Sequence, residues 1–364
     1  MTISTTTGLA RYYAGHRPVL TVAEPELLKN IMIRDFNSFT DRNFELLIDP
    51  VLNRNVAQAS GDDWKRLRQI ISPAFSSGRM KRMYPSIREC LRDFTAHLDA
   101  YARDGRPMNA KEMFGNFTMD VVATCAFATK TNIHNDPNNP VTTTVKPEGL
   151  QYFNDLMSNI ITTRKEMPDS SAKYSDFLQL LMDARNDRVA AHESAITDES
   201  GTGSLKPSAP TPAVPHKQMS DDEVRANTFV ILMSAYETTA TTLTIAMYEL
   251  ALQPRLQERL YAELKAAMDA DGEIDYDTLQ ALTYLDQVVS ETLRLHPPGI
   301  RATRLATQDY KLGDTGIVIR KGQQVDIPTY AIHHSPENYP DPYRYDPDRF
   351  SPANRGKIKP YTYA

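Results

Sequence analysis

The feature that most constrains this chain is a long apolar stretch between residues 220 and 253. It opens with Ser220 and Glu223, which can form a capping box: the Ser hydroxyl caps a backbone N–H while the Glu carboxylate reaches back. From residue 228 to 252 nearly every residue is apolar, Thr or Ala, and Pro254 marks the end. The pattern predicts one helix of about 30 residues, about 45 Å long, apolar on all sides and therefore buried.

Glu237, Thr238 and Thr239 lie in the middle of this predicted helix, where an uncompensated carboxylate is costly. One interpretation is a core helix whose Thr hydroxyls bond to the preceding turn, with Glu237 at a surface edge. A membrane span is disfavoured, because Glu237 would lie near the centre of the bilayer. The other interpretation is an acid–alcohol pair kept at the centre of a domain because chemistry takes place there.

The composition fits one large core or two ordinary domains, with 364 residues of which 41% are hydrophobic. A net charge of −5 gives no bias toward nucleic acid. Two cysteines, Cys90 and Cys125, are too few for a disulfide framework and are compatible with a reducing compartment. Their positions on predicted helices indicate a structural role for both. Residues 1–10 are polar and small, which predicts neither a signal peptide nor a membrane anchor in this soluble or peripherally bound chain.

Around the central stretch the pattern is mostly helical. Apolar residues recur at helical spacing in segments 84–101, 113–125, 150–164, 174–188, 254–264 and 284–295, and a helix opens at Pro25. Short strands are expected at residues 17–22, 310–312, 317–319 and 324–327. Residues 191–218 are rich in Ser, Thr, Gly and Pro, which predicts a disordered connection rather than a domain boundary.

Another helical segment, residues 62–75, carries the single tryptophan of the chain. Trp64 and Arg68 would share one face, where an indole N–H beside a guanidinium suits a carboxylate or phosphate. The plainer interpretation is a half-buried Trp beside a solvated Arg. Nearby cations form a basic patch, either a solvated face or a dock for an acidic partner: Lys65, Arg66, Arg68, Arg79, Lys81 and Arg82.

Glu291 and Arg294 lie three residues apart near the end of segment 284–295, so their side chains would meet on a helix. The plainer interpretation is an exposed ion pair worth a few tenths of a kcal/mol. Four residues of the same segment are expected to face the core: Leu285, Val288, Val289 and Thr292.

Four motifs, taken in order, resemble signatures of the cytochrome P450 family. They are Trp64-x-x-x-Arg68, Ser234-Ala235-Tyr236-Glu237-Thr238-Thr239, Glu291-Thr292-Leu293-Arg294 and Pro347-Asp348-Arg349-Phe350. They resemble the family's W-x-x-x-R helix, its central acid–alcohol motif, its E-x-x-R helix and its P-E-R-F segment. Each motif alone is weak, but four at these spacings are specific. The sequence pattern around the first two motifs is most similar to the microsomal group that includes family 3 and thromboxane synthase. The resemblance to the cytochrome P450 family covers nearly the whole chain.

The resemblance implies a role for each motif. A buried charge network, costly unless every partner is present, would join a helix to an irregular segment through Glu291, Arg294 and Arg349. The haem propionates would be held by charge-assisted hydrogen bonds from Arg42, Trp64, Arg68 and Arg301. Glu237 and Thr238 would deliver protons during dioxygen cleavage. In the family a cysteine thiolate is the haem ligand.

The sequence departs from the family pattern in three places. Ala235 stands where the central helix usually has Gly, which adds a methyl group where oxygen and substrate approach. The region between Pro140 and Tyr174 looks shorter than in the family. The chain also ends before the F-x-x-G-x-R-x-C-x-G loop, and neither Cys90 nor Cys125 has such a context, so we assign no axial ligand and expect a fragment, splice product or incomplete gene model.

We therefore predict a mainly α fold with a small β portion, as one cytochrome P450-type domain over residues 1–364 that is incomplete at its C-terminus. The implied function is haem-thiolate monooxygenation of a lipophilic small molecule. The monomer would use dioxygen and NADPH through NADPH–cytochrome P450 reductase, which docks on the basic patch, at the endoplasmic reticulum membrane. The alternatives are a haem-free remnant acting as an interaction protein, and a haem protein that rearranges peroxides without the reductase.

Overall fold

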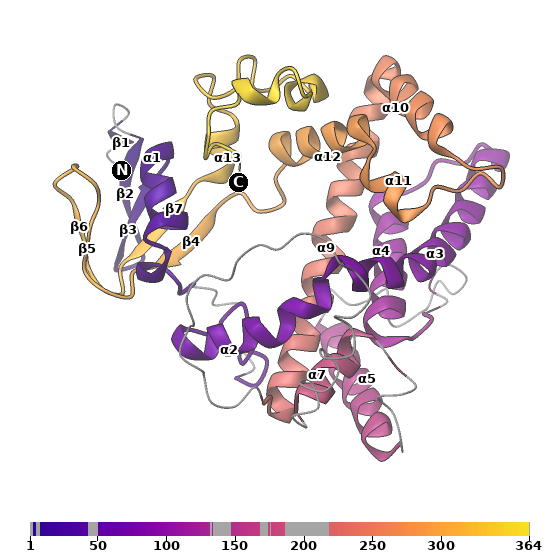
Figure 1. The fold of residues 1–364 in the computed structure, drawn as a ribbon, viewed down its shortest axis with the longest axis horizontal. Coiled ribbons are helices and arrows are strands. Elements are labelled where there is room, and N and C mark those ends of the chain that lie inside the picture. Colours follow the sequence, from indigo (N-terminus) through magenta and orange to yellow (C-terminus); the bar gives the residue numbers. More distant parts are fainter. Residues whose placement is uncertain are drawn as a thin grey trace, which may run out of the picture. The chain divides into compact units, whose positions relative to one another are not determined.

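The computed structural model describes residues 3–4, 8–42, 50–131, 133, 147–167, 174, 176–185 and 218–363. The chain divides into two compact units (Figure 1), which we call the sheet unit, Met1–Phe44 with Thr238–Ala364, and the helical unit, Glu45–Glu237. Helix α9, Asp221–Leu252, contributes residues to both units. The disordered connection expected at residues 191–218 lies outside the described residues except for Gln218. A single domain over residues 1–364 stays a prediction.

The helical unit contains most of the amphipathic helices that the sequence predicts. They are α2 (Gly61–Ile71), η3 (Ser72–Phe75), α3 (Ser77–Asp104), α4 (Ala110–Phe127), α5 (Pro147–Glu166), α7 (Phe177–Arg185) and the first part of α9. Their apolar faces meet in one core whose most buried members include Met119, Leu178, Leu181 and Leu232. The predicted positions of these helices are therefore confirmed, with α7 beginning three residues later than Tyr174.

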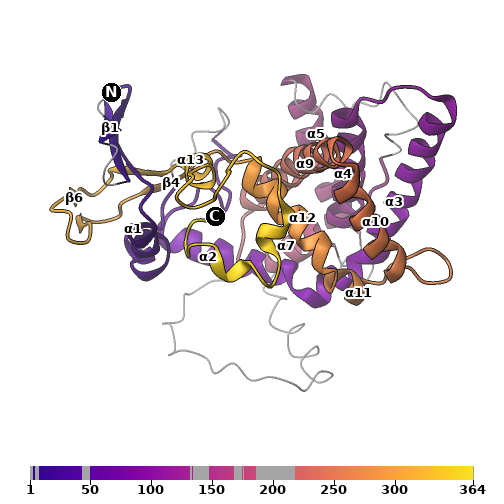
Figure 2. The same cartoon turned by 90° about the horizontal axis from the view of Figure 1, so that it is seen from above.

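The sheet unit is built on a sheet with the strand order β1-β2-β3-β7-β4 (Figure 1), whose strands β1 and β4 are labelled in the view from above (Figure 2). Its strands are β1 (Ile3–Ser4), β2 (Leu9–Ala14), β3 (Arg17–Val22), β4 (Ala302–Leu305) and β7 (Gln324–Ile327). A separate hairpin pairs β5 (Tyr310–Lys311) with β6 (Val318–Ile319). Strands β3 and β7 run parallel, so residues 305 positions apart in the chain, such as Val19 and Gln324, are neighbours here. The sequence pattern predicted β3, β5, β6 and β7 but missed β1, β2 and β4.

The sheet unit also contains several helices besides the second part of α9. They are α1 (Pro25–Lys29), η1 (Asn30–Arg34), η2 (Phe36–Ser38), α10 (Pro254–Ala267), α11 (Tyr276–Gln280), α12 (Thr283–Leu295), α13 (Thr329–His333), η5 (Pro347–Phe350) and η6 (Arg355–Lys357). Within α12, Val288 and Thr292 are buried, but Val289 is 42% exposed, so its predicted place in the core was wrong. At 100° per residue, Val289 lies to the side of the face that Val288 and Thr292 share.

Helix α9 begins as predicted, with a capping box at its N-terminus. The Ser220 N–H donates to Glu223 Oε2 at 2.7 Å, and the Glu223 N–H donates to Ser220 Oγ at 3.3 Å. The expectation that the helix is buried on all sides was wrong, because Tyr248 and Leu252 are each 60% exposed. An all-round apolar composition does not require all-round cover, since much of a folded surface is apolar. Among the described residues, α9 is the one helix long and apolar enough to cross a membrane, which by itself is weak evidence.

Candidate functional site

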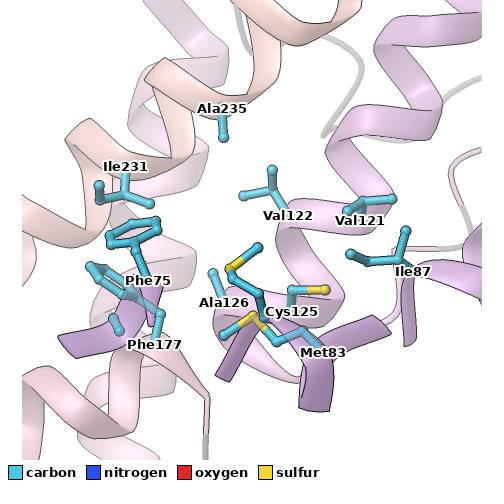
Figure 3. A pocket seen from close by; sticks show the side chains of 12 residues that line it. Phe75, Met83, Ile87, Val121, Val122, Cys125, Ala126, Phe177, Ile231 and Ala235 are labelled. Carbon is cyan, nitrogen blue, oxygen red and sulfur yellow. The ribbon is translucent and has the colours of Figure 1, made fainter. Parts of the chain in front are cut away.

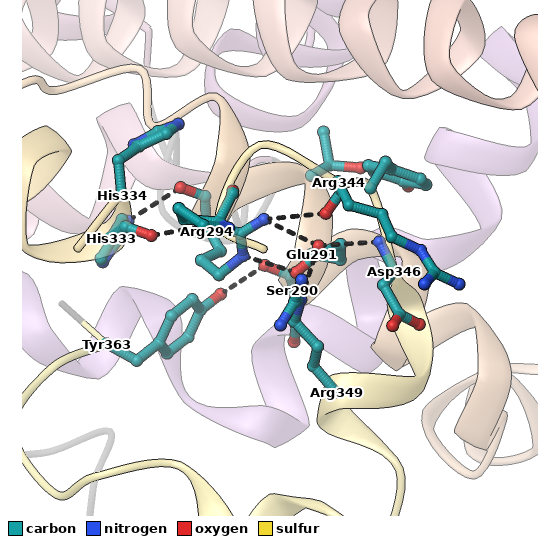
Figure 4. A network of polar contacts seen from close by, with 12 residues as sticks. Ser290, Glu291, Arg294, His333, His334, Arg344, Asp346, Arg349 and Tyr363 are labelled. Carbon is teal, nitrogen blue, oxygen red and sulfur yellow. Dashed lines mark hydrogen bonds and ion pairs between the residues drawn. The ribbon is translucent and has the colours of Figure 1, made fainter. Parts of the chain in front are cut away.

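The structure brings Glu291, Arg294 and Arg349 together in the sheet unit (Figure 4). The Glu291 and Arg294 side chains, one turn apart on α12, are both 0% exposed. Arg294 Nε donates to Glu291 Oε2 at 2.7 Å and Nη2 donates to Oε1 at 2.8 Å. Arg349, from η5, places its Nε 3.4 Å from Glu291 Oε1. The pair is therefore a buried bidentate contact rather than the exposed pair of the plainer interpretation.

The remaining donors of Arg294 bind the last residue of α13 and the irregular chain that follows this helix. Nη1 donates to the carbonyls of His333 at 2.9 Å and Pro342 at 2.8 Å, and Nη2 to that of Arg344 at 3.3 Å. In return His333 Nδ1 lies 3.0 Å from the Arg294 carbonyl, an acceptor, so Nδ1 carries the proton. Burial lowers the pKa of His333 to about 4, which keeps the ring neutral at pH 7. Five acceptors thus converge on one guanidinium.

Glu237 lies on α9 at the edge of the helical unit, and its partner comes from α4. Lys111 Nζ donates to Glu237 Oε1 at 2.6 Å. The two side chains are 45% and 51% exposed, so Glu237 is neither buried nor uncompensated. Thr238 is exposed and is the first residue of the sheet unit. The sequence predicted the acid–alcohol pair but gave no sign of Lys111, which is 126 residues away.

The structure places the predicted propionate-binding residues on both units. Trp64 is half-buried and Arg68 exposed on α2, while Arg42 and Arg301 are exposed in the sheet unit. The Arg301 guanidinium is already engaged: Nη1 lies 3.0 Å from Tyr12 Oη and 3.2 Å from Asp326 Oδ2. Asp326 is 3% exposed, so Arg301 serves as the counter-charge of a buried carboxylate.

Arg304 is the cation that the sequence analysis missed. Asp41 and Leu305 form an antiparallel bridge, which sets Arg42 opposite Arg304. Arg304 is only 8% exposed, and among the described residues its Nε has no hydrogen-bond partner. Burial, with a further contribution from Arg42, lowers the pKa of Arg304 to about 10. A buried guanidinium with an unsatisfied donor, whose pKa also responds to the charge of a second arginine, is an arrangement that fits an anionic group.

A signal for Arg304 was present in the alternation of β4. Side chains alternate across a strand, so Arg304 lies on the face opposite to that of Arg301 and Thr303. Both Arg301 and Thr303 bind Asp326, which leaves Arg304 on the other face. The bridge to Asp41 could not be anticipated, because it joins segments 264 residues apart.

The basic patch of the helical unit is less positive than the sequence suggests. Lys65 Nζ lies 3.1 Å from Asp62 Oδ1, and Arg66 Nη2 lies 3.0 Å from Asp63 Oδ1. Arg66 also pairs with Glu223 of the capping box. Local acids therefore neutralise part of the patch.

Both cysteines are structural, as expected. Burial raises the pKa of Cys90 to about 12 and that of Cys125 to about 11, so neither is a thiolate near neutral pH. Cys125 faces an apolar cavity of about 180 Å³ in the helical unit (Figure 3). Val121, Met83 and Ala235 are among the other side chains that line it, and the lining contains no predicted site residue.

Comparisons with known proteins identify the family. The family model "Cytochrome P450" matches residues 5–364. The chain belongs to the cytochrome P450 family. Cytochrome P450 3A2 of Rattus norvegicus is 33% identical over 368 residues, and cytochrome P450 3A11 of Mus musculus is 31% identical over 369 residues. Each alignment covers 96% of this chain and 71% of the relative.

These findings confirm the predicted P450 resemblance, its likeness to family 3 and the mainly helical fold. At the family level they imply a haem, whose propionates are carboxylates. The structure supplies donors that fit such carboxylates, with the unsatisfied Nε of buried Arg304 as the clearest. Cys90 is buried and Cys125 lines the apolar cavity of the helical unit, and we assign neither of them as the thiolate ligand.

Proposed function

We propose that this P450 chain serves haem-thiolate monooxygenation of lipophilic small molecules. The family supplies the class of reaction, and the Arg42–Arg304 arrangement is the observation that carries the proposal, because a buried guanidinium with an unsatisfied donor is costly without an anion. Arg304 and Arg42 would hold a haem propionate, and Trp64, Arg68 and Arg301 stay candidates for the same role. When bound, the haem would supply dioxygen activation.

Glu237 and Thr238 are proposed to handle the protons that this reaction consumes. A carboxyl group can exchange protons with bulk water, and a hydroxyl that accepts a proton can release its own proton onward to the reacting group. The exposure of Glu237 supports access to bulk water, since 51% of its side chain is exposed. The electrons would come from NADPH through NADPH–cytochrome P450 reductase docked on the basic patch. The reductase, the monomeric state and the endoplasmic reticulum location stay predictions.

Haem binding tests the Arg304 assignment. The change Arg304→Gln should weaken haem affinity by about 10- to 100-fold, because a charge-assisted hydrogen bond contributes about 1.5–3 kcal/mol. The matched control is Arg320→Gln, which removes an exposed arginine of the same unit whose partner is Asp309 at 2.6 Å. Haem titration followed by absorbance gives both affinities. Equal affinity of the Arg304 variant and the parent chain would refute the assignment.

Coupling tests the acid–alcohol pair. In a haem-loaded version of the enzyme that also carries a thiolate ligand, supplied with the reductase, Thr238→Ala should lower the amount of product formed per NADPH and raise peroxide release, because proton delivery is disturbed while haem binding is not. Haem content measured on the same sample serves as the control. Unchanged product per NADPH would return Thr238 to the role of a helix residue that bonds to the preceding turn.

A haem-free interaction protein is the second candidate, because no cysteine of the described residues is assigned as a haem ligand. A polypeptide of residues 1–364 that fails to bind haem at micromolar concentrations, yet unfolds cooperatively, would support this candidate over the enzyme.

A further inference from the structure

One face of α4 contacts α9 at the two residues Tyr236 and Glu237. Lys111, Gly115 and Thr118 lie four and three residues apart, so they form a single stripe on that helix. Thr118 Oγ1 shares its proton between the Gly115 carbonyl at 3.1 Å and the Tyr236 carbonyl at 3.2 Å. A Cβ at Gly115 would lie 3.2 Å from Tyr236 Oη, so only glycine gives the Tyr236 ring its full space. Together with the 2.6 Å contact of Lys111 Nζ, the stripe fixes Glu237 against α4.

The position of Lys111 on α4 favours an ion pair with a nearby carboxylate. The helix starts at Ala110 after the N-cap Asn109, whose side chain accepts from the Glu112 N–H at 3.3 Å. Lys111 therefore lies in the first turn, where the positive end of the helix dipole disfavours a cation. A carboxylate close to this turn interacts favourably with both the ammonium group and the dipole. Burial raises the pKa of Tyr236, and the negative charge of Glu237 adds to this, as expected for adjacent groups.

Without a partner, a carboxylate that is 51% exposed would occupy several rotamers. The lysine contact selects among them. We propose that Lys111 is a positioning residue for Glu237: it holds the carboxylate at the α4 side of α9, one residue before Thr238, and so sets the starting point of proton delivery. This inference rests on the proposed function of Glu237 and Thr238. Lys111 itself is not assigned any contact with substrate or haem.

Lysine labelling tests the contact without any need for activity. A polypeptide of residues 1–364 is reacted with an amine-specific acylating reagent, and the rate at Lys111 is followed by peptide mass spectrometry. In Glu237→Gln the rate at Lys111 should rise about two- to five-fold, the range that corresponds to loss of an exposed ion pair. Lys130, whose partner is Glu89, is the internal control and should react at the same rate in both proteins. An unchanged rate at Lys111 would overturn the proposal.

Coupling in the same haem-loaded version of the enzyme, which carries a thiolate ligand, tests the consequence. Lys111→Met should lower product per NADPH about two- to five-fold, and Lys111→Arg, which can still reach the carboxylate, should restore most of it. Lys130→Met should behave like the parent enzyme, because its ion pair lies elsewhere. A melting temperature close to that of the parent protein shows that Lys111→Met is folded.

The outcomes separate the two proposals. If Glu237→Gln uncouples the enzyme but Lys111→Met does not, positioning by Lys111 is wrong and the role of Glu237 stands. If neither variant changes coupling, the proton-delivery role of Glu237 is wrong and the functional meaning of the Lys111 contact falls with it. If Lys111→Arg is as uncoupled as Lys111→Met, the lysine acts through something other than its charge, and the positioning proposal is overturned.

Discussion

Removal of the Arg294 guanidinium is the most severe test of the buried network. The change Arg294→Ala leaves the Glu291 carboxylate, 0% exposed, with only the Arg349 guanidinium at 3.4 Å and the Asp346 N–H at 2.8 Å. Breaking a buried pair by removal of one partner costs about 3–5 kcal/mol. The carbonyls that Arg294 also binds, those of His333, Pro342 and Arg344, lose their donor.

Each of these carbonyls adds about 1 kcal/mol, which brings the loss to about 6–8 kcal/mol. A domain is stable by only about 5–15 kcal/mol, so the sheet unit of Arg294→Ala should be largely unfolded or close to it. Arg294→Lys keeps a cation beside Glu291 but cannot reach all five acceptors, so its loss should be smaller, about 2–4 kcal/mol.

Urea denaturation with pulse proteolysis measures these losses, because cleavage sites can be assigned to the sheet unit by mass spectrometry. The control is Arg320→Ala, whose ion pair with Asp309 is exposed, 72% and 53% for the two side chains, and should cost less than about 1 kcal/mol. An Arg294→Ala protein with the urea midpoint of the parent would refute the reasoning and would mean that the network contributes no net stability.

Three further predictions concern other buried groups. Burial lowers the pKa of His333 to about 4 from an ordinary value near 6.5, so the unfolded chain binds more protons than the folded chain between these two pH values. The free energy of unfolding should therefore fall by up to about 3 kcal/mol as the pH drops from 6.5 to 4. A His333→Asn protein whose urea midpoint has the same pH dependence as the parent would contradict this. The raised pKa values of Cys90 and Cys125 predict that iodoacetamide alkylates both thiols at least about 100-fold more slowly than in the urea-unfolded chain. We also expect no thiolate-type band in the ferrous–CO spectrum of a polypeptide of residues 1–364. Fast alkylation, or such a band, would show that a thiolate is present. In the helical unit, Arg164 binds Asp176 through two hydrogen bonds of 2.7 and 2.6 Å, and the two side chains are only 4% and 7% exposed. Arg164→Ala should therefore lower the free energy of unfolding by about 3–5 kcal/mol, measured by urea denaturation followed by tryptophan fluorescence. A loss below about 1 kcal/mol would count against this prediction.

Contacts within one turn of helix could be predicted from the sequence. The capping box of Ser220 and Glu223 and the meeting of Glu291 with Arg294 both depend on residues three apart, and helix geometry alone brings such residues together. Helix positions followed from periodicity for the same reason. Burial could not be predicted in this way. The sequence allowed an exposed Glu291–Arg294 pair and a fully buried α9, but in the structure the pair is buried and α9 is partly exposed.

Tertiary structure decided which charged groups meet across long separations. The sequence named Arg301 as a carboxylate ligand, but the pairing of β4 with β7 gives it Asp326, while the bridge between Asp41 and Leu305 sets Arg304 opposite Arg42. Strand register depends on backbone hydrogen bonds between distant segments, and a shift by one residue exchanges the faces of a strand. The sequence by itself therefore determined the family, the helices and their caps, whereas only the folded chain decided the partners of Arg301, Arg304 and Glu237, because those contacts join segments that no local pattern relates.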